Sequence, residues 1–98
     1  MRRYILSPRA GADMDALVEF YGDTHPDYGV RLVRDLVAQF KLLARFPGLG
    51  KPANELLPGL RMSRVRDVII YFRRLASGAE IVRVIHGARH ITTDDFRS

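Results

Sequence analysis

Apolar residues in the second half of the chain follow patterns that are typical of β-strands. The run from Val68 to Phe72 is unbroken, which is long enough for a central strand and too short for a capped helix. The segment after Pro58-Gly59 places arginines among apolar residues, and Glu80–His86 follows Ser77-Gly78, a turn pair that can supply positive φ. We therefore predict an antiparallel meander of three strands joined by short turns.

The beginning of the chain predicts a short strand and a first helix. Arg2–Leu6 reads as the strand, and Ser7-Pro8 begins the helix, with the serine as cap and the proline at the first helical position. We expect this helix to end near Gly22, which suits a C-terminal cap. Its apolar positions recur at helical spacing and are Ala10, Met14, Leu17 and Tyr21.

A second helix carries the clearest apolar stripe in the chain. Pro26 begins it, and Pro47-Gly48 ends it. Residues 47–58 contain three prolines and two glycines, and we expect them to form an ordered crossover loop. A connection of three or four residues makes the two helices an antiparallel hairpin. The stripe consists of Val33, Leu36, Val37, Phe40, Leu43 and Ala44.

Together these elements predict one α+β domain that spans residues 1–98. The helix hairpin has a wide apolar side, and the meander is the only surface that can bury it. We expect two antiparallel helices on one face of a mostly antiparallel four-stranded sheet, in the order strand, helix, helix and three strands, with the other face uncovered. A chain of 98 residues supports a single modest core, and 47% apolar residues are typical of a folded protein.

Composition excludes several classes of protein. The longest apolar run falls far short of the ~20 residues of a membrane span, and no apolar region or cleavage site follows Met1-Arg2-Arg3-Tyr4. The chain has no cysteine, and its three histidines do not have the spacing of metal ligands. We expect a cytoplasmic protein that needs no membrane, metal or cofactor.

Positive charge is concentrated in the second half of the chain. The net charge is +5, and residues 51–98 carry nine Lys and Arg against five Asp and Glu. Fourteen of the sixteen basic residues are arginine, which pairs bidentately with carboxylates and phosphates. One interpretation is a solvated basic surface. The other is a basic face that meets nucleic acid or an acidic protein segment, so direct nucleic-acid binding stays open.

Arginines on the predicted strands are the candidates for chemistry. Metal-free RNA cleavage needs a base, a cation and an acid, and the strands supply Arg61, Arg64, Arg83 and His86. Alternation sends Arg61 and Arg64 to opposite faces, so they serve one site only with a bulge between them. It also places Arg83 on the face of Ile81. His86, at a strand end before glycine, has the alternative interpretation of a hydrogen-bonded structural histidine.

Five short sequence words occur in a characteristic order along the chain. They are Leu6-Ser7-Pro8-Arg9-Ala10, Phe46-Pro47-Gly48-Leu49-Gly50-Lys51-Pro52, Leu57-Pro58-Gly59-Leu60-Arg61, Ile70-Tyr71-Phe72-Arg73 and Val82-Arg83-Val84-Ile85-His86-Gly87-Ala88-Arg89. With their intervals, they resemble the RelE/ParE superfamily of toxins from type II toxin–antitoxin modules, most closely the ParE branch. The resemblance spans about residues 3–91.

The resemblance implies a toxin that a cognate ParD-like antitoxin neutralises by wrapping it with a C-terminal segment. The ParE branch acts on DNA gyrase and has no accepted hydrolytic site, whereas the RelE branch cleaves messenger RNA on the ribosome. RelE-branch nucleases carry a tyrosine near the C-terminus, and this chain has none after Tyr71. We therefore expect a gyrase inhibitor that is not an enzyme.

Two alternatives to the gyrase inhibitor stay open. The first is a ribosome-dependent mRNA endonuclease that uses the four groups named above as phosphate binders or acid–base groups. The second is a non-toxic relative that only binds its antitoxin. For contact with the target or the antitoxin, we predict Arg61, Arg64, Arg83, Arg89 and His90, because an arginine inside a meander needs a partner or faces a groove.

Overall fold

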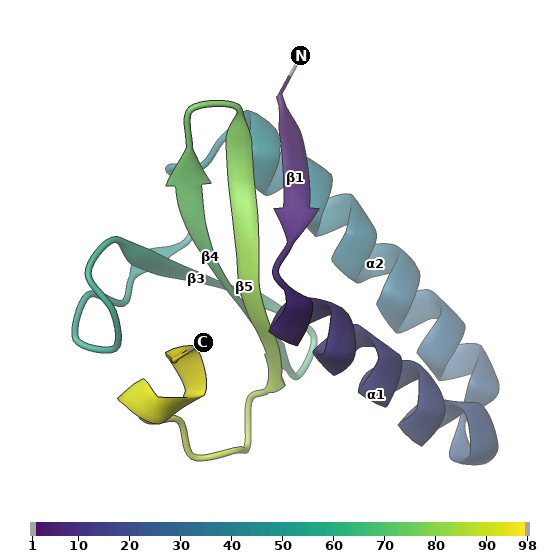
Figure 1. Cartoon of the computed structure of the whole chain (residues 1–98). Coiled ribbons are helices and arrows are strands. Elements are labelled where there is room, and N and C mark those ends of the chain that lie inside the picture. Colours follow the sequence, from purple (N-terminus) through teal and green to yellow (C-terminus); the bar gives the residue numbers. More distant parts are fainter. Residues whose placement is uncertain (1, 98) are drawn as a thin grey trace.

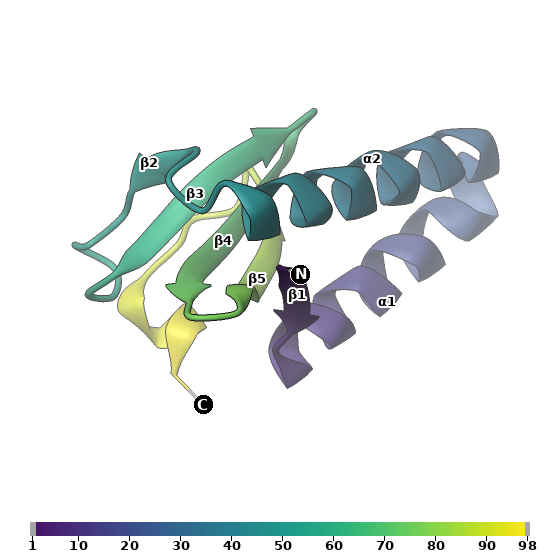
Figure 2. The same ribbon diagram turned by 90° about the horizontal axis from the view of Figure 1, so that it is seen from above.

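A mixed β-sheet forms the centre of the protein, and two helices cover one of its faces (Figure 1 and Figure 2). The computed structural model describes residues 2–97. The elements are β1 (Arg3–Leu6), α1 (Pro8–Thr24), α2 (Pro26–Arg45), β2 (Lys51–Pro52), β3 (Leu60–Val65), β4 (Val68–Leu75), β5 (Gly78–His86) and a 3₁₀ turn, η1 (Thr93–Phe96). The strands lie in the order β1-β5-β4-β3-β2, with β1 parallel to β5 and the other neighbours antiparallel. This confirms the predicted α+β fold.

The predicted count of four strands was one too low within residues 2–97. The additional strand, β2, lies in the stretch expected to be loop, and it pairs Lys51 with Met62 of β3 at the sheet edge. Gly50 makes this approach possible: its φ is +81°, and a Cβ there would lie 2.3 Å from the carbonyl oxygen of Met62. The sequence did not predict β2 because two residues are too few to show an alternating pattern. Pro52 is compatible with its place there, because proline is tolerated in a strand at the edge of a sheet.

Ser7 and Pro26 set the limits of α1. The Ser7 hydroxyl accepts a hydrogen bond from the backbone N–H of Ala10 at 3.0 Å and donates one to the carbonyl of Val82 on β5 at 2.8 Å. It therefore caps the helix and fixes it to the sheet. At the other end, α1 continues past Gly22 to Thr24, because the restriction that Pro26 places on His25 ends the helix. Neither α1 nor α2 is long and apolar enough to cross a membrane.

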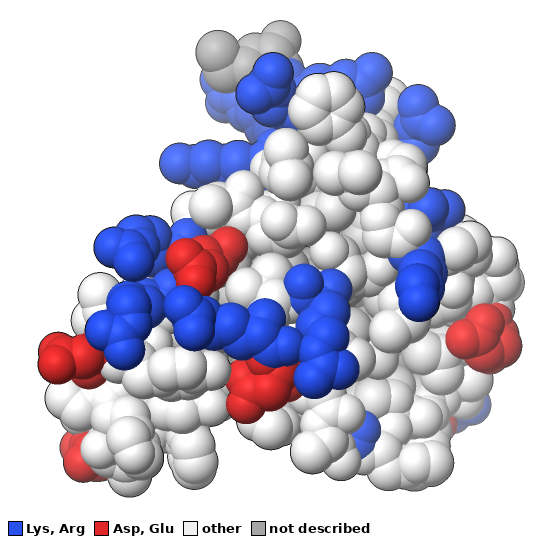
Figure 3. Space-filling model, turned by 180° about the vertical axis from the view of Figure 1, so that it is seen from behind, with Lys and Arg blue, Asp and Glu red and all other residues white. Residues whose placement is uncertain are grey.

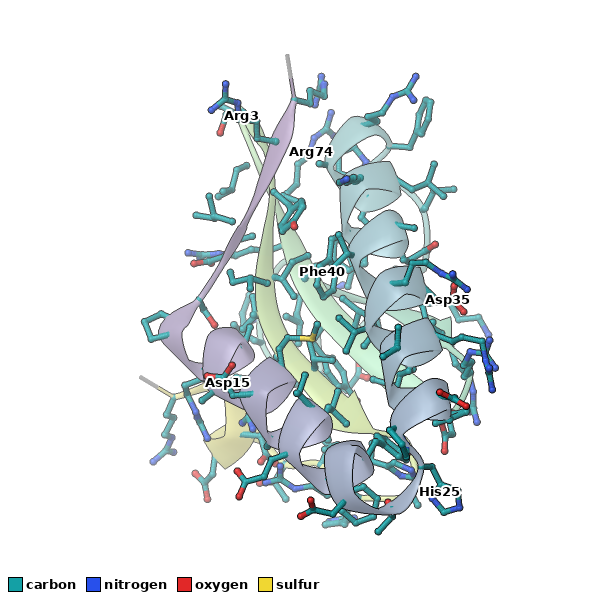
Figure 4. All side chains as sticks on the ribbon, turned by 90° about the vertical axis from the view of Figure 1, so that its right-hand side faces the viewer. Arg3, Asp15, His25, Asp35, Phe40 and Arg74 are labelled. Carbon is teal, nitrogen blue, oxygen red and sulfur yellow. The ribbon has the colours of Figure 1, made fainter. Side chains whose placement is uncertain are left out.

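The larger core lies between the helices and the sheet. The predicted stripes face inward here, and Phe40 of α2 points between the helix and the strands (Figure 4). The sequence stripe omitted Leu32, which is also fully buried. The fully buried or nearly buried members are Ala10, Tyr21, Leu32, Leu36, Phe40, Leu43, Val68, Ile70, Phe72, Ala79, Ile81 and Val84.

A second, smaller core covers part of the opposite face, which we call the open face. The sequence predicted that this face is uncovered, but the crossover loop and the C-terminal residues fold back over it (Figure 1). Phe96 of η1 packs edge-on against Tyr71 of β4, with ring centroids 5.0 Å apart. The buried members are Ala53, Leu60, Tyr71 and Ile85.

Candidate functional site

A β-bulge in β5 decides where Arg83 points. Tyr71 pairs with Arg83 and Phe72 pairs with Ile81, which leaves Val82 as an additional residue without a partner on β4. The alternation predicted for this strand is therefore wrong, because Arg83 does not share a face with Ile81. Ile81 packs in the helix-side core, whereas Val82 packs against the core of the open face.

Arg83 forms an internal ion cluster that joins three elements. Its guanidinium donates to both carboxylate oxygens of Asp13 on α1, at 2.7 and 2.9 Å, and to the backbone carbonyl of Asp95 at 2.7 Å. Asp13 also accepts a hydrogen bond from the N–H of Val84 at 2.9 Å. The bond to Asp13 raises the pKa of Arg83. With 5% of its surface exposed, Arg83 crosslinks the fold and presents little surface to a partner.

Asp95 holds the C-terminal turn in place beside this cluster. Its carboxylate accepts hydrogen bonds from the N–H of Thr92, at 2.9 Å, and from the guanidinium of Arg89. The Thr92 N–H and the neighbouring arginines hold the pKa of Asp95 below its ordinary value. Arg9 of α1 donates to the carbonyl of Arg97 at 2.7 Å, so α1 is attached to the same turn.

A groove of about 500 Å³ lies between this turn and β5 on the open face. Leu57, Val82 and Phe96 supply its apolar lining, and Arg73 and Arg97 lie at its rim. Arg73 forms an ion pair with Glu80, and Arg97 forms one with Asp94. We call this hollow the open-face groove.

Arg61 and Arg64 serve separate parts of the structure. Arg61 donates to three backbone carbonyls of residues 48–50, at 2.9 to 3.3 Å, and so anchors the loop after α2. Arg64 donates to the carbonyl of Arg66 at 2.7 Å, in the turn between β3 and β4. No bulge lies between them in β3, and their guanidinium groups do not share a site.

His86 belongs to a hydrogen-bonded chain at the end of the sheet. Its Nδ1 accepts from the N–H of Ala88, so Nε2 donates to Asp67 at 3.0 Å. Tyr28 of α2 donates to the other carboxylate oxygen of Asp67 at 3.0 Å. Burial acts to raise the pKa of Asp67, but the bonds from Tyr28 and His86 outweigh it, and the pKa is lowered. This geometry fits the structural interpretation of His86.

The candidate groups for RNA cleavage do not converge. Arg83 is buried in its cluster, His86 is paired with Asp67, and Arg61 is bonded to a loop at the far edge of the sheet. Arg89 and His90 lie on the exposed segment that follows β5, where His90 makes no side-chain hydrogen bond within residues 2–97. Within residues 2–97, no three His, Asp or Glu side chains gather as a metal site would require.

Sequence reasoning did not identify the residues of an apolar surface on the helix hairpin. Val18 of α1 and Val30 of α2 are 54% and 68% exposed, and they line a groove of about 300 Å³ whose remaining walls are Gly22, Pro26, Gly29 and Val33. We call it the hairpin groove; it lies near the helix connection, where Figure 4 shows His25. The sequence does carry a signal for this surface, because Val18 and Val30 are apolar residues that fall outside the predicted buried stripes.

Three comparisons with known proteins agree with one another. The family model described as the ParE toxin of type II toxin-antitoxin system, parDE, matches residues 4–91. Toxin ParE1 of Caulobacter vibrioides is 31% identical over 90 residues, which cover 88% of this chain and 90% of that protein. A chain from the structure of the chromosomal ParDE TA system from P. aeruginosa has a TM-score of 0.73 at 26% identity, over 88% of this chain and 96% of that chain.

Proposed function

The chain belongs to the ParE toxins of type II toxin–antitoxin systems, and we propose that a cognate ParD-like antitoxin neutralises it and that it inhibits DNA gyrase in the cytoplasm. The antitoxin partner is supported by the likeness to a chain from a ParDE system. The gyrase target is supported by the resemblance to the ParE branch. The inhibition is by binding, without a hydrolytic step.

The observation that carries this proposal over RNA cleavage is the position of Arg83. A cation that stabilises a cleavage transition state must reach the reacting phosphate. Arg83 instead has its guanidinium occupied by Asp13 and the carbonyl of Asp95, and it is 5% exposed. His86 is directed to Asp67, away from that cluster. An inhibitor that works by binding needs neither group in a catalytic role.

The hairpin groove is the surface that we propose for the antitoxin. Val18 and Val30 are both more than half exposed, and such a contiguous apolar hollow fits the apolar face of a partner segment that folds on binding. Replacing Val18 and Val30 together by serine weakens antitoxin affinity by tenfold or more, measured by calorimetric titration. Ile5→Ser, at an exposed apolar position on β1, is the control and leaves affinity unchanged. Equal losses in both variants contradict this placement.

Arg89 and His90 are the residues that we propose for contact with gyrase. Both lie on the exposed segment after β5, on the side of the open face. Arg83 was predicted to act with them, but its contribution to binding is to hold Asp95 and the C-terminal turn in place. Arg61 and Arg64 keep a supporting role at the loop and turn that their guanidinium groups bind.

A supercoiling assay tests the function. Purified gyrase and relaxed plasmid are incubated with the toxin, with and without excess antitoxin. Inhibition that the antitoxin relieves supports the proposal. Unaffected gyrase together with cut transcripts in primer extension on translating ribosomes supports the RelE-like alternative. Unaffected gyrase with intact transcripts, in a protein that still binds its antitoxin, identifies a non-toxic relative.

A further inference from the structure

Four cations form a straight row on the outer surface of α2. Arg31, Arg34, Lys41 and Arg45 are separated by three, seven and four residues. At 3.6 residues per turn, these spacings place all four within an arc of about 80° around the helix axis. At 1.5 Å per residue, the row is about 21 Å long. All four side chains are exposed.

The charge of this row is compensated only in part, because Asp27, four residues before Arg31, is the one carboxylate of α2 within the same arc. None of the four forms a salt bridge with any residue that the structure describes. Asp35, the carboxylate nearest the middle of α2, is paired with Arg66 of the neighbouring turn at 3.0 Å. Seen from behind, Lys and Arg side chains gather across this face of the molecule, with individual Asp and Glu side chains between and beside them (Figure 3). We call the four residues the α2 row.

The two helices of the hairpin differ in charge. Helix α1 carries Arg9 as its only cation among four carboxylates, whereas α2 carries four cations and two carboxylates. The second carboxylate of α2, Asp27, lies in the first turn, where it complements the helix dipole. The positive charge of the hairpin is therefore concentrated on α2.

We propose that the α2 row binds the phosphate backbone of duplex DNA. Duplex DNA carries one negative charge per about 1.7 Å of its axis, so a duplex segment as long as the row carries about 12 phosphate charges. An acidic peptide needs apolar anchors to bind well. Ala38 is the one apolar residue within the arc, and the exposed Val30 and Leu42 lie just outside it on opposite sides, so they form no continuous apolar stripe beside the row. Single-stranded nucleic acid needs a series of aromatic platforms. The arc contains none, and the one exposed aromatic beside it, Phe46, has the guanidinium of Arg45 over its ring at 5.4 Å from the centroid. The inference does not rest on gyrase as the target.

The test is the salt dependence of binding to a labelled duplex of arbitrary sequence, about 20 base pairs long, followed by fluorescence anisotropy. The full chain binds at about 150 mM salt with a dissociation constant between about 10⁻⁶ and 10⁻⁴ M, the range of non-specific DNA binding at physiological salt. Four phosphate contacts give a slope of log K against log salt near −3.6, which is about a 150-fold loss between 50 and 200 mM.

Two double variants that have the same net charge distinguish binding by the α2 row from a general effect of positive charge. Arg31→Gln with Arg34→Gln reduces the slope by about 1.8, because two contacts are lost. Arg73→Gln with Arg97→Gln, on the opposite side of the sheet, leaves the slope unchanged. Equal effects of the two doubles overturn the proposal, as does a dissociation constant above about 10⁻³ M at 50 mM salt. Row-dependent binding of polyglutamate without binding of the duplex shows an acidic protein partner instead, and also overturns it.

Discussion

At the scale of single residues, Arg83 contributes most to holding distant parts of the chain together. Its guanidinium binds Asp13 on α1 and the carbonyl of Asp95 in the C-terminal turn. Arg83→Ala leaves Asp13 largely buried without its cation, and we expect a loss of about 3–5 kcal/mol in the free energy of unfolding. Urea denaturation measures it. Arg73→Ala, which breaks the more exposed pair with Glu80, costs at most about 1 kcal/mol and is the control.

A loss below about 1 kcal/mol for Arg83→Ala contradicts the crosslinking role. A double-mutant cycle with Asp13→Ala provides a second check, because residues in direct contact show coupling of about 0.5–3 kcal/mol. Absence of coupling means that the measured loss comes from packing and not from the ion pair.

Asp95 makes the attachment of the C-terminal turn dependent on pH. Its pKa is lowered in the folded protein, chiefly by the Thr92 N–H and the neighbouring arginines. Its stabilising effect is therefore complete above the unfolded pKa of about 3.9 and is lost as pH falls through the lower folded value. Asp95→Asn destabilises the protein by about 1–3 kcal/mol at pH 7. The difference from the original protein shrinks as the pH falls below the unfolded pKa, and it disappears only below the lowered folded pKa, where the aspartate is protonated too.

Urea titrations from pH 7 down to the lowest pH at which the protein stays folded measure this dependence. Asp94→Asn is the matched control, because the neighbouring carboxylate is largely exposed and its pairing with Arg97 contributes little. A destabilisation by Asp95→Asn that stays constant over the whole pH range shows that the carboxylate charge is not what holds the turn.

At the scale of elements, the C-terminal turn stabilises the open face through Phe96. This ring packs on Tyr71 with centroids 5.0 Å apart, and it is partly buried. Phe96→Ala is expected to cost about 1–3 kcal/mol, less than for a fully buried phenylalanine. Val30→Ala, at a position of α2 that is 68% exposed, is the control and changes stability by at most about 0.5 kcal/mol. Similar losses for both variants contradict the packing role of the turn.

The elements that the sequence predicted well are those in which periodicity and terminating residues agree. The apolar stripe of α2 lies between Pro26 and Pro47-Gly48, and the meander follows from strand runs separated by turn residues. The features that it did not predict depend on contacts between distant segments. The bulge at Val82 accompanies the hydrogen bond from Ser7, 75 residues earlier, and β2 exists because Gly50 allows close approach to β3. No local pattern encodes either contact.

The same distinction applies to the candidate site residues. Charge and strand position identified Arg61, Arg64 and Arg83 as residues that need partners, and each has polar partners within the chain. Single-sequence patterns do not reveal whether such a partner is internal or external, because that depends on the tertiary position of residues such as Asp13. The hairpin groove was missed for a related reason: Val18 and Val30 resemble scattered surface residues until the helices are paired.

At the scale of the whole molecule, the proposed gyrase contact lies apart from the two proposed partner surfaces on the helices, which adjoin each other at Val30 and Arg31. The hairpin groove and the α2 row are on the helices, and Arg89 and His90 follow β5 on the other side. His90→Ala is expected to weaken gyrase inhibition at least threefold without changing stability, because the side chain is exposed and makes no internal hydrogen bond within residues 2–97. Dose–response curves in the supercoiling assay measure it.

His25 provides the control for that prediction. It is also exposed, and it lies at the junction of α1 and α2, far along the chain from the C-terminal segment. His25→Ala leaves the half-inhibitory concentration unchanged. An equal shift for both histidine variants, or none for His90→Ala, removes the C-terminal segment from the gyrase contact.

The most direct measurement of a gyrase-directed toxin is the amount of cleaved plasmid DNA that remains attached to gyrase after protease digestion. Toxin is added to gyrase and plasmid, with and without prior addition of the antitoxin. We expect cleaved DNA to accumulate with toxin alone and to return to the background level when the antitoxin is present. No accumulation at toxin concentrations that saturate antitoxin binding contradicts gyrase as the target.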